Sequence, residues 1–501
     1  MAGGRVGDRF GLRAVRWRDH GGFALIFAVG VVLRGLTLRA YRPALEFSQD
    51  SFSYLYDAQH LGADLVRPIG YPIFLRLMSY SHHLTLVAVV QHGLGLASAV
   101  ILYVLLLRLG VRPWLAALAT VPILLDAYQV YLESFVLAEA VFEFLLVAGL
   151  FLLLRVDRPA VGACVAAGLL IAAACLTRTT GIFVLAPVLA YLVVRRVGVA
   201  PLAATLGAVA LVLGGYAVWF RSGTGHLGLE RYDGYFLAGR VEPFADCRGL
   251  QLPPLERPLC DSTPPGQRRS TDWYIWNEHA PLRRPNVPAG TDRNAVAGDF
   301  ARRILLHQPG PYLGQTAHDV LHYFSPGHSI GHQDFGIESW QFLTSSTPDP
   351  WTPVAPPTDY YVGVWTNPGP HTQYQVKVGN QGFGNTRVSP HFSVRSAAFL
   401  RHYQDFGYTP GPVLAGCLLL AAIGSVGRVD PRDRQRRGVA LLLAAGGFFV
   451  LLAPAMTAVF DYRYQLPTLL LLPPAGALGL TMIQRRVRGR DVTAPAQQGV
   501  G

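Results

Sequence analysis

The chain has 501 residues, of which 51% are apolar and only 15% are charged. An ordinary soluble domain has about 25% charged residues, so composition excludes a single soluble globule, a disordered chain and a disulfide miniprotein. The 43 basic and 31 acidic residues give a net charge of +12, and the apolar residues come in long runs that are typical of an integral membrane protein.

Ten apolar stretches come close to the length of about 20 residues that a membrane-spanning helix needs. In chain order they are Gly21–Tyr41, His83–Leu107, Pro113–Tyr128, Tyr131–Leu154, Ala160–Leu176, Thr179–Val194, Pro201–Phe220, Gly411–Gly427, Gly438–Phe460 and Leu466–Ile483. The sequence therefore predicts a mainly α fold, a polytopic bundle of about ten transmembrane helices.

The distribution of arginine predicts the orientation of these helices. With a cytoplasmic N-terminus, the inner segments are 1–20, 108–112, 155–159, 195–200, 428–437 and 484–501. They contain 20 arginines and 6 aspartates, a net charge of +14, whereas the rest of the chain sums to −2. Positive side chains concentrate in cytoplasmic segments of membrane proteins. We therefore expect both termini in the cytoplasm of a plasma-membrane protein, and no nucleic-acid partner is needed to explain the charge.

This orientation divides the chain into four parts. They are an N-terminal membrane core (1–220) with a first outer loop (42–82), an extracytoplasmic module (221–410), C-terminal transmembrane helices (411–483) and a cytoplasmic tail (484–501). The module is rich in Pro, Gly, Trp and Tyr, and we interpret it as a small mixed module. Periodicity predicts helices at Ala295–His307 and Tyr312–Phe324. The Pro-rich segment Ser325–Pro370 is interpreted as a loop.

The five cysteines divide by location. Cys164, Cys175 and Cys417 lie in apolar stretches and are expected only to pack. Cys247 and Cys260 lie in the outer module, in an oxidising compartment, which favours a disulfide between them. No CxxC spacing accompanies them, so we expect no zinc site.

The first outer loop carries acidic and phenolic side chains at helical spacing: Glu46, Asp50, Tyr54 and Asp57. A short helix over Ser51–Leu61, capped by Ser48 or Asp50, would suit the membrane surface. A carboxylate just above the bilayer suits a general base that faces a lipid-borne substrate. The alternative from spacing alone is a capped amphipathic helix with a solvated acidic face.

The stretch Tyr131–Leu154 contains Glu133, Glu139 and Glu143. Carboxylates inside a membrane are costly and usually face a cavity or a partner. Position alone leaves two alternatives open: a functional site, or a buried pair with an arginine that only fixes helix packing.

Two arginines lie in short outer turns, where arginine is disfavoured. Arg178 follows Thr177, and Arg463 precedes the last apolar stretch. A guanidinium binds phosphate through a bidentate fork, so this pair suits a lipid phosphate. The alternative is a pair of interfacial or salt-bridged arginines, with Asp461 the obvious partner of Arg463. Arg34, near the outer end of the first stretch, is a weaker candidate of the same kind.

At these residues the chain resembles the GT-C superfamily of integral membrane glycosyltransferases. It is most similar to the bacterial group related to protein O-mannosyltransferases, aminoarabinose transferases and mycobacterial arabinofuranosyltransferases. The motifs follow the family's order: Val32-Leu33-Arg34, Asp50-Ser51 with Tyr54, Arg67-Pro-Ile-Gly70-Tyr71-Pro72, Leu125-Asp126-Ala-Tyr128-Gln-Val-Tyr131-Leu-Glu133, Ala138-Glu139-Ala-Val-Phe, Thr177-Arg178-Thr-Thr-Gly181 and Asp461-Tyr-Arg463-Tyr464-Gln-Leu-Pro467.

The resemblance implies a glycosyltransferase that takes its sugar from a polyprenyl-monophosphate donor at the outer membrane face and inverts the anomeric carbon. It places the catalytic base on Asp50 and the donor phosphate on Arg178 and Arg463. The residues expected to line the pocket are Glu46, Tyr54, Arg67, Glu139 and Tyr464. Glu46 departs from the tandem acidic pair of protein mannosyltransferases, since four positions separate it from Asp50.

The expected acceptor is a glycan, lipid or protein of the cell envelope. No nucleotide, flavin or haem motif is present, so we expect no cofactor, while a divalent metal stays open. The main alternative is a transporter or flippase of lipid-linked sugars, against which the lack of a visible repeat argues. A non-catalytic scaffold for wall synthesis would leave the outer arginines unexplained.

Overall fold

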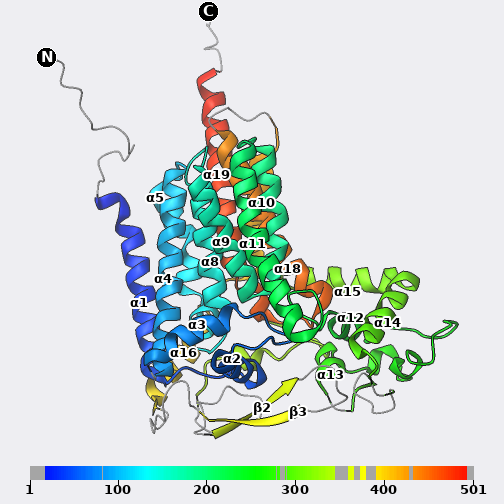
Figure 1. Cartoon of the computed structure of the whole chain (residues 1–501). Helices are drawn as coiled ribbons and strands as arrows, with labels where there is room; N and C mark the ends of the chain where they lie inside the picture. Colours follow the sequence, from blue (N-terminus) through cyan, green and yellow to red (C-terminus); the bar gives the residue numbers. More distant parts are fainter. Residues whose placement is uncertain are drawn as a thin grey trace, which may run out of the picture.

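The computed structural model describes residues 17–81, 83–277, 279–281, 288, 290–344, 359–365, 373–379, 391–427 and 433–493. The chain is mainly helical, and its long helices run side by side in one bundle (Figure 1). The bundle helices are α1 (Gly21–Ala40), α4 (Leu84–Arg108), α5 (Pro113–Ala119), α6 (Val121–Leu125), α8 (Glu139–Leu154), α9 (Val161–Thr177), α10 (Ile182–Val194), α11 (Val199–Thr224), α17 (Gly411–Ser425), α18 (Arg434–Thr457) and α19 (Thr468–Thr493).

Among the described residues, five helical segments are long and apolar enough to cross a membrane. They are Arg18–Ala40, Leu84–Arg108, Val199–Thr224, Arg434–Thr457 and Tyr462–Arg488. Shorter apolar helices cover Val161–Thr177, Thr179–Val194 and Gly411–Ser425. The chain is therefore a multi-pass membrane protein, and each of the ten predicted stretches coincides with helical structure, although only five reach full spanning length.

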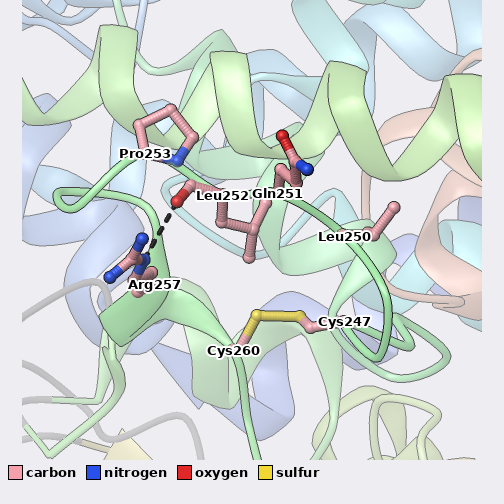
Figure 2. Close-up of a pocket in the computed structure, with 7 residues that line it drawn as sticks. All are labelled: Cys247, Leu250, Gln251, Leu252, Pro253, Arg257 and Cys260. Atoms are coloured by element: carbon pink, nitrogen blue, oxygen red, sulfur yellow. Dashed lines mark hydrogen bonds between the residues drawn. A yellow bond between two sulfur atoms is a disulfide. The ribbon is translucent and has the colours of Figure 1, made fainter.

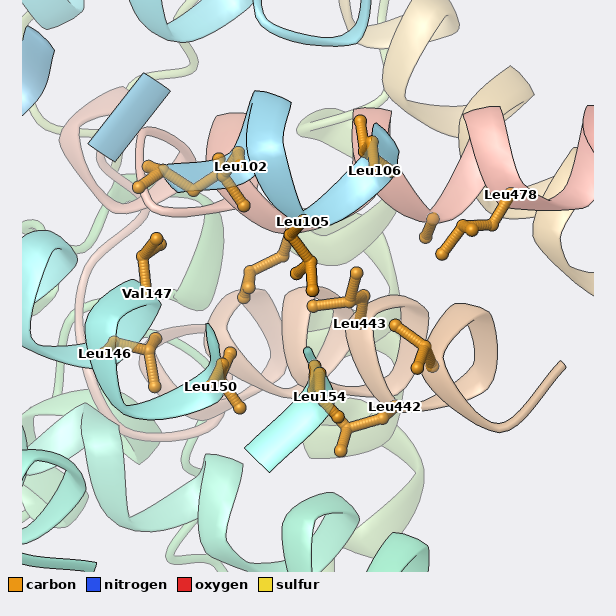
Figure 3. Close-up of a cluster of buried hydrophobic side chains, with 14 of the residues drawn as sticks. Leu102, Leu105, Leu106, Leu146, Val147, Leu150, Leu154, Leu442, Leu443 and Leu478 are labelled. Atoms are coloured by element: carbon orange, nitrogen blue, oxygen red, sulfur yellow. The ribbon is translucent and has the colours of Figure 1, made fainter. Parts of the chain in front are cut away.

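The bundle is held by a leucine-rich core. Figure 3 shows buried side chains of α4, α8, α18 and α19 that interdigitate, among them Leu105, Leu150 and Leu443. Close backbone approach also contributes, because a Cβ on Gly479 of α19 would lie 2.1 Å from the carbonyl oxygen of Leu420. Small residues at helix contacts permit this approach in membranes, where the hydrophobic effect between helices is weak.

Two predicted stretches are interrupted. Pro113–Tyr128 divides into α5 and α6, and Tyr131–Leu154 was wrongly predicted as continuous, because the chain leaves the helix after Leu132. A short helix α7 (Ala127–Leu132) precedes that break, and Asp126 caps it by accepting N–H groups of the next turn. Helix α7 therefore occupies the junction between the two predicted stretches.

Buried polar side chains satisfy the backbone at these interruptions. The Arg34 guanidinium donates to the carbonyls of Ile123 and Leu124, at 3.0 and 2.8 Å. The Gln91 amide donates to the carbonyls of Glu133 and Phe135, at 2.9 and 2.6 Å. Irregular backbone at membrane depth is tolerated only when its polar groups find such partners, which explains why the helix can break here.

The remaining elements gather at one end of the bundle, the lower end in Figure 1, which we call the site end. The helices there are α2 (Ser48–His60), α3 (Gly70–Met78), α12 (Asp233–Val241), α13 (Thr271–Trp276), α14 (Arg293–His307), α15 (Pro309–His322) and α16 (Val394–Gln404). Strand β1 (Tyr41–Arg42) pairs antiparallel with β4 (His391–Phe392), which joins the end of α1 to the start of α16.

A second antiparallel pair, β2 (Asp359–Trp365) and β3 (Gln373–Gly379), sets Val362 opposite Val376. The interpretation of 325–370 as loop throughout is therefore wrong at β2. The tyrosines, valines and tryptophan of this strand favour extended structure, and the flanking prolines concealed that signal. The predictions for the helices α14 and α15 are confirmed, with α15 beginning three residues early at Pro309, where proline suits the first helical turn.

Helix α2 differs from its predicted form in two respects. It begins at Ser48 after the N-cap Phe47, which has no side-chain cap, and the Ser51 hydroxyl instead accepts the N–H of Phe47 at 2.7 Å. The capping prediction is thus wrong. Leu55 and Ala58 are also buried against the protein, so the apolar residues of α2 do not rest on the membrane surface.

The cysteine predictions are confirmed. Cys247 and Cys260 form a disulfide, and the free thiols of Cys164 and Cys175 are buried, with Cys417 partly so. The disulfide closes a loop across 13 positions between α12 and α13.

We expect removal of the disulfide by Cys247→Ala with Cys260→Ala to destabilise the 221–410 region by about 3 kcal/mol, because the unfolded chain regains loop entropy. Thermal unfolding and protease sensitivity of the full chain would measure this, with Cys417→Ala as the control for loss of a thiol. Finding both thiols free in protein from its native membrane would contradict the prediction.

Candidate active site

Three arginines and two carboxylates from five separate segments meet at the site end, and we call this set the ion cluster. Its members are Asp50 in the first turn of α2, Arg67 before α3, Glu139 at the start of α8, Arg178 after α9 and Arg463 in the turn η9 (Tyr462–Gln465). All five were singled out from the sequence, and the fold brings them together.

Asp50 lies between two guanidinium groups. Arg67 Nη2 donates to its Oδ1, and Arg463 Nη1 donates to its Oδ2 at 3.0 Å. Burial alone would raise the pKa of Asp50, but the charges of Arg67 and Arg463 outweigh it and hold the pKa well below its usual range. The carboxylate is therefore ionised, and about a quarter of its side chain remains exposed.

Glu139 joins the other two arginines. Its Oε1 accepts from Arg178 Nη1 and lies 3.4 Å from Arg463 Nε. The Glu139 side chain is 3% exposed, whereas those of Arg178 and Arg463 are 15% and 10% exposed. Asp461 Oδ2 also lies 3.8 Å from Arg463 Nε, and Asp64 Oδ2 lies 4.0 Å from Arg67 Nη1, so four carboxylates surround the three guanidinium groups. Each guanidinium has five N–H donors, more than these ion pairs use, so the cluster can still bind an anion.

The turn that carries Arg463 is rigidly held. Asp461 Oδ1 accepts the backbone N–H of Arg463 at 2.8 Å and the Nε1–H of Trp340 at 2.7 Å. The Trp340 ring, in the short turn η7 (Ile337–Trp340), also lies 5.2 Å from the Arg463 guanidinium. The region 221–410 thus orients a cluster arginine, and sequence reasoning missed Trp340 because 121 positions separate it from Asp461.

Two tyrosines that were predicted to line the pocket face the arginines. The Tyr54 ring lies 5.7 Å from the Arg67 guanidinium. The Tyr464 ring lies 5.7 Å from that of Arg178 and 5.3 Å from that of Arg463. A guanidinium is attracted to an aromatic face, so these rings help to fix the arginines without neutralising them.

Glu46 is not brought into the ion cluster. Its side chain is 1% exposed, and neither carboxylate oxygen has a hydrogen-bond partner in the described part of the chain. Burial raises the pKa of Glu46 well above its usual range. Arg34, a weaker phosphate candidate, pairs instead with Glu133 at 2.7 Å, and both are almost fully buried.

Asp272 on α13 is a second residue that the sequence did not indicate. Burial, together with the charges of Asp461 and Asp50, raises the pKa of Asp272 to about 7, against the opposing effect of Arg463. This carboxyl therefore changes charge near neutral pH within the electrostatic reach of the ion cluster. The one local feature of the sequence at Asp272 is its position two residues after Ser270, the N-cap of a short helix.

We expect Asp272→Asn to change the pH dependence of stability. A carboxyl whose pKa is raised on folding destabilises the folded state progressively as pH rises from its ordinary value of 3.8 to about 7. The asparagine side chain cannot ionise, so the difference in melting temperature between the variant and the wild type should increase in the variant's favour from pH 5 to pH 7. At pH 8 this difference should stay at its value at pH 7. Asp299→Asn, which removes an exposed carboxylate of α14, is the control, and a difference that does not vary with pH would contradict the expectation.

One surface depression lies away from these residues. It has a volume of about 770 Å³ and borders the disulfide, with the Arg257 side chain donating to the carbonyl of Leu252 at 3.0 Å (Figure 2). Its lining residues are Cys247, Leu250, Gln251, Leu252, Pro253, Arg257 and Cys260. No member of the ion cluster borders it, so it is separate from the candidate site.

Comparison with known proteins gives one family and one solved structure. Residues 78–199 match the family described as dolichyl-phosphate-mannose-protein mannosyltransferase, a segment that includes Glu139 and Arg178. The Saccharomyces cerevisiae protein O-mannosyltransferase Pmt1–Pmt2 complex bound to the sugar donor is similar at 16% identity and a TM-score of 0.35. That alignment covers 48% of this chain and only 38% of the yeast chain. No curated protein sequence matches the chain significantly.

Proposed function

We propose, on the premise that this chain is a GT-C membrane glycosyltransferase of the protein-mannosyltransferase family, that it transfers a sugar from a polyprenyl-monophosphate donor to an envelope acceptor. The family description favours mannose as the sugar. The acceptor is a hydroxyl of a glycan, lipid or protein.

We place the site end outside the cell and both termini in the cytoplasm, with all ten apolar stretches in the membrane. The excess of arginine in the inner segments supports this orientation. Nucleotide sugars are made in the cytoplasm, so an enzyme that works outside needs a donor that the lipid itself delivers. The four parts predicted from the sequence then correspond to a membrane core, an outer module, the last helices and an inner tail.

The observation that carries this proposal is the ionised Asp50 carboxylate beside clustered guanidinium groups. In the proposed reaction, Asp50 accepts the proton of the acceptor hydroxyl, and the acceptor oxygen attacks the anomeric carbon from the face opposite the phosphate. The bond between that carbon and the phosphate oxygen breaks, and the phosphate keeps the bonding electrons. The anomeric carbon is inverted.

The low pKa of Asp50 makes it a weak base, which suits this reaction. Glycosyl transfer passes through an oxocarbenium-like state, so bond breaking runs ahead of bond making. The acceptor hydroxyl becomes acidic only as its oxygen bonds to carbon, and a weak base suffices at that late stage.

In the proposed reaction, the arginines stabilise the negative charge of the donor phosphate. Arg178 and Arg463 would hold the donor phosphate, whose negative charge grows as the glycosidic bond breaks, and preorganised charges of this kind are usually the largest contribution to such transfers. Arg67 would orient Asp50, while Glu139 would orient Arg178 and Arg463. Tyr54 and Tyr464 would line the donor pocket, and we assign no role to Glu46.

The direct test uses purified full-length protein in liposomes with radiolabelled polyprenyl-phosphate mannose and an extracted envelope acceptor. A transferase should release polyprenyl phosphate and label the acceptor, and both products should disappear in Asp50→Asn. Movement of intact donor between leaflets without bond cleavage would instead identify a flippase and overturn the proposal.

A further inference from the structure

Helix α15 presents an apolar face that no other described element covers. Leu313 and Leu321 on this face are 62% and 69% exposed, and Ala317 lies one turn from each and is also exposed. Gly310 and Gly314 fill the positions between them. Within α15, which is described along its whole length, this face has no Asp, Glu, Lys or Arg.

The opposite face of α15 fixes the rotation of the helix about its axis. Thr316, Asp319 and Val320 are buried. The Asp319 carboxylate pairs with Arg240 of α12 at 2.7 Å, and both side chains are nearly inaccessible. The leucine face is therefore held outward and cannot turn into the protein.

The position of α15 is set by the end of α18. Near the start of α15, the Tyr312 hydroxyl donates to the carbonyl of Met456 at 3.0 Å. In its last turn, the His322 ring stacks on Phe460 at 4.3 Å. These two residues of α15 are about 15 Å apart along the axis, yet both contact the short segment where α18 ends. The helix therefore lies against the end of α18, at the side of the bundle's lower end and crosswise to the bundle helices (Figure 1).

We expect the membrane boundary at this height, because α18 is long and apolar enough to span the bilayer and ends at Thr457. We propose that α15 is an interfacial helix whose Leu313, Ala317 and Leu321 face rests in the lipid leaflet at the site end. An amphipathic helix with an uncharged apolar face at this depth has the chemistry of a lipid-surface anchor. The face lies beside the end of α18, a helix that is long and apolar enough to span the bilayer, which favours lipid over a soluble protein as its partner.

The anchor would have a consequence for the ion cluster. In the residue after α15, Tyr323, the hydroxyl donates to the carbonyl of Asp461 at 3.1 Å, and the backbone carbonyl accepts from the Gln465 side-chain amide at 2.5 Å. Seating α15 in the lipid would thus fix the height of the turn that holds Arg463. Guanidinium groups at that height lie level with lipid phosphates.

Site-directed spin labelling of the full chain in phosphatidylcholine nanodiscs tests this inference. The background variant replaces Cys164, Cys175 and Cys417 by alanine and keeps the disulfide. A nitroxide is then placed by Leu313→Cys, by Ala317→Cys or by Leu321→Cys, and its collisions with oxygen and with a water-soluble nickel chelate are compared. Leu255→Cys, in the turn beside the disulfide, is the water-exposed control, and Leu211→Cys on the spanning helix α11 is the lipid control.

We expect the three α15 labels to favour oxygen over nickel, between the two controls, at a depth of about 5–10 Å below the headgroup boundary. Nickel access equal to that at position 255 would place the face in water and overturn the inference. Exclusion of both reagents would show that a protein, such as a second copy of the chain, covers α15, and would also overturn it. These measurements do not require transferase activity, so their outcome is independent of the proposed function.

Discussion

Asp50→Asn is expected to lower turnover by about 10²–10⁴, which is the usual loss when a general base is removed. The amide is nearly the same size, and its single oxygen can still accept from one of the two arginines, but its nitrogen cannot accept from the other and the group cannot accept a proton. Donor binding should therefore change much less than turnover. The measurement is kcat and the donor KM with polyprenyl-phosphate mannose, with melting temperature as the check on folding.

Asp57→Asn provides a matched control for this experiment. Asp57 lies on the same helix, two turns along, and is also buried, but it makes no ion pair with the arginines of the cluster. Loss of activity in Asp50→Asn but not in Asp57→Asn would support the assignment. Near-normal turnover of a well-folded Asp50→Asn protein would move the base elsewhere, with Asp272 the next carboxylate to examine.

The ion cluster could be predicted because its members carry local signals. Arg178 and Arg463 stand in outer turns where arginine is unusual, and Asp50 begins a short loop helix. Both arginines lie at the ends of apolar stretches, and helices that cross the same membrane bring their ends to the same level. In a membrane protein, the predicted topology therefore indicates which residues lie at the same level, whereas the sequence of a soluble protein gives no such indication.

The sequence predictions differ from the structure where contacts between distant parts of the chain determine the surroundings of a side chain. Glu46 is four positions before Asp50, which on a helix would place both on one face. The chain is extended at Phe47, with φ −105° and ψ 97°, so Glu46 precedes the helix and points elsewhere. Arg34 looked like a phosphate candidate, but it pairs with Glu133, which is 99 positions away, to support a broken helix.

Trp340 and Asp272 lie at or near the candidate site, although nothing in the sequence indicated them. Both come from the 221–410 region, whose irregular segments have no hydrophobic period to indicate which residues turn inward. Trp340 contacts Asp461 from a single 3₁₀ turn, and Asp272 lies within electrostatic reach of the cluster on a helix of six residues. Neither position follows from spacing along the chain.

The second large effect is expected at the two arginines, and the structure separates their roles. Arg178 pairs with Glu139 alone, whereas Arg463 contacts both Glu139 and Asp50. Arg178→Gln should therefore raise the apparent donor constant while leaving the pH dependence of kcat/KM in place. Arg463→Gln should also raise the pKa of Asp50 toward its usual value, because one of the two charges that hold it down is lost. The acid side of the pH profile should then move to higher pH.

The size of the donor effect distinguishes a phosphate site from packing. A hydrogen bond to a charged group contributes about 1.5–3 kcal/mol, so each Gln variant should weaken apparent donor binding about 10- to 150-fold. Turnover should fall as well, because the phosphate gains charge in the transition state. Lysine at either position keeps the positive charge but not the bidentate geometry of the guanidinium. The Lys variants should therefore weaken donor binding less than the Gln variants do. Arg303→Gln, which breaks an arginine–glutamate pair with Glu256, is the matched control. If both Gln variants melt at a lower temperature but keep wild-type donor affinity and turnover, the arginines only brace the bundle, and the phosphate must bind beyond this cluster.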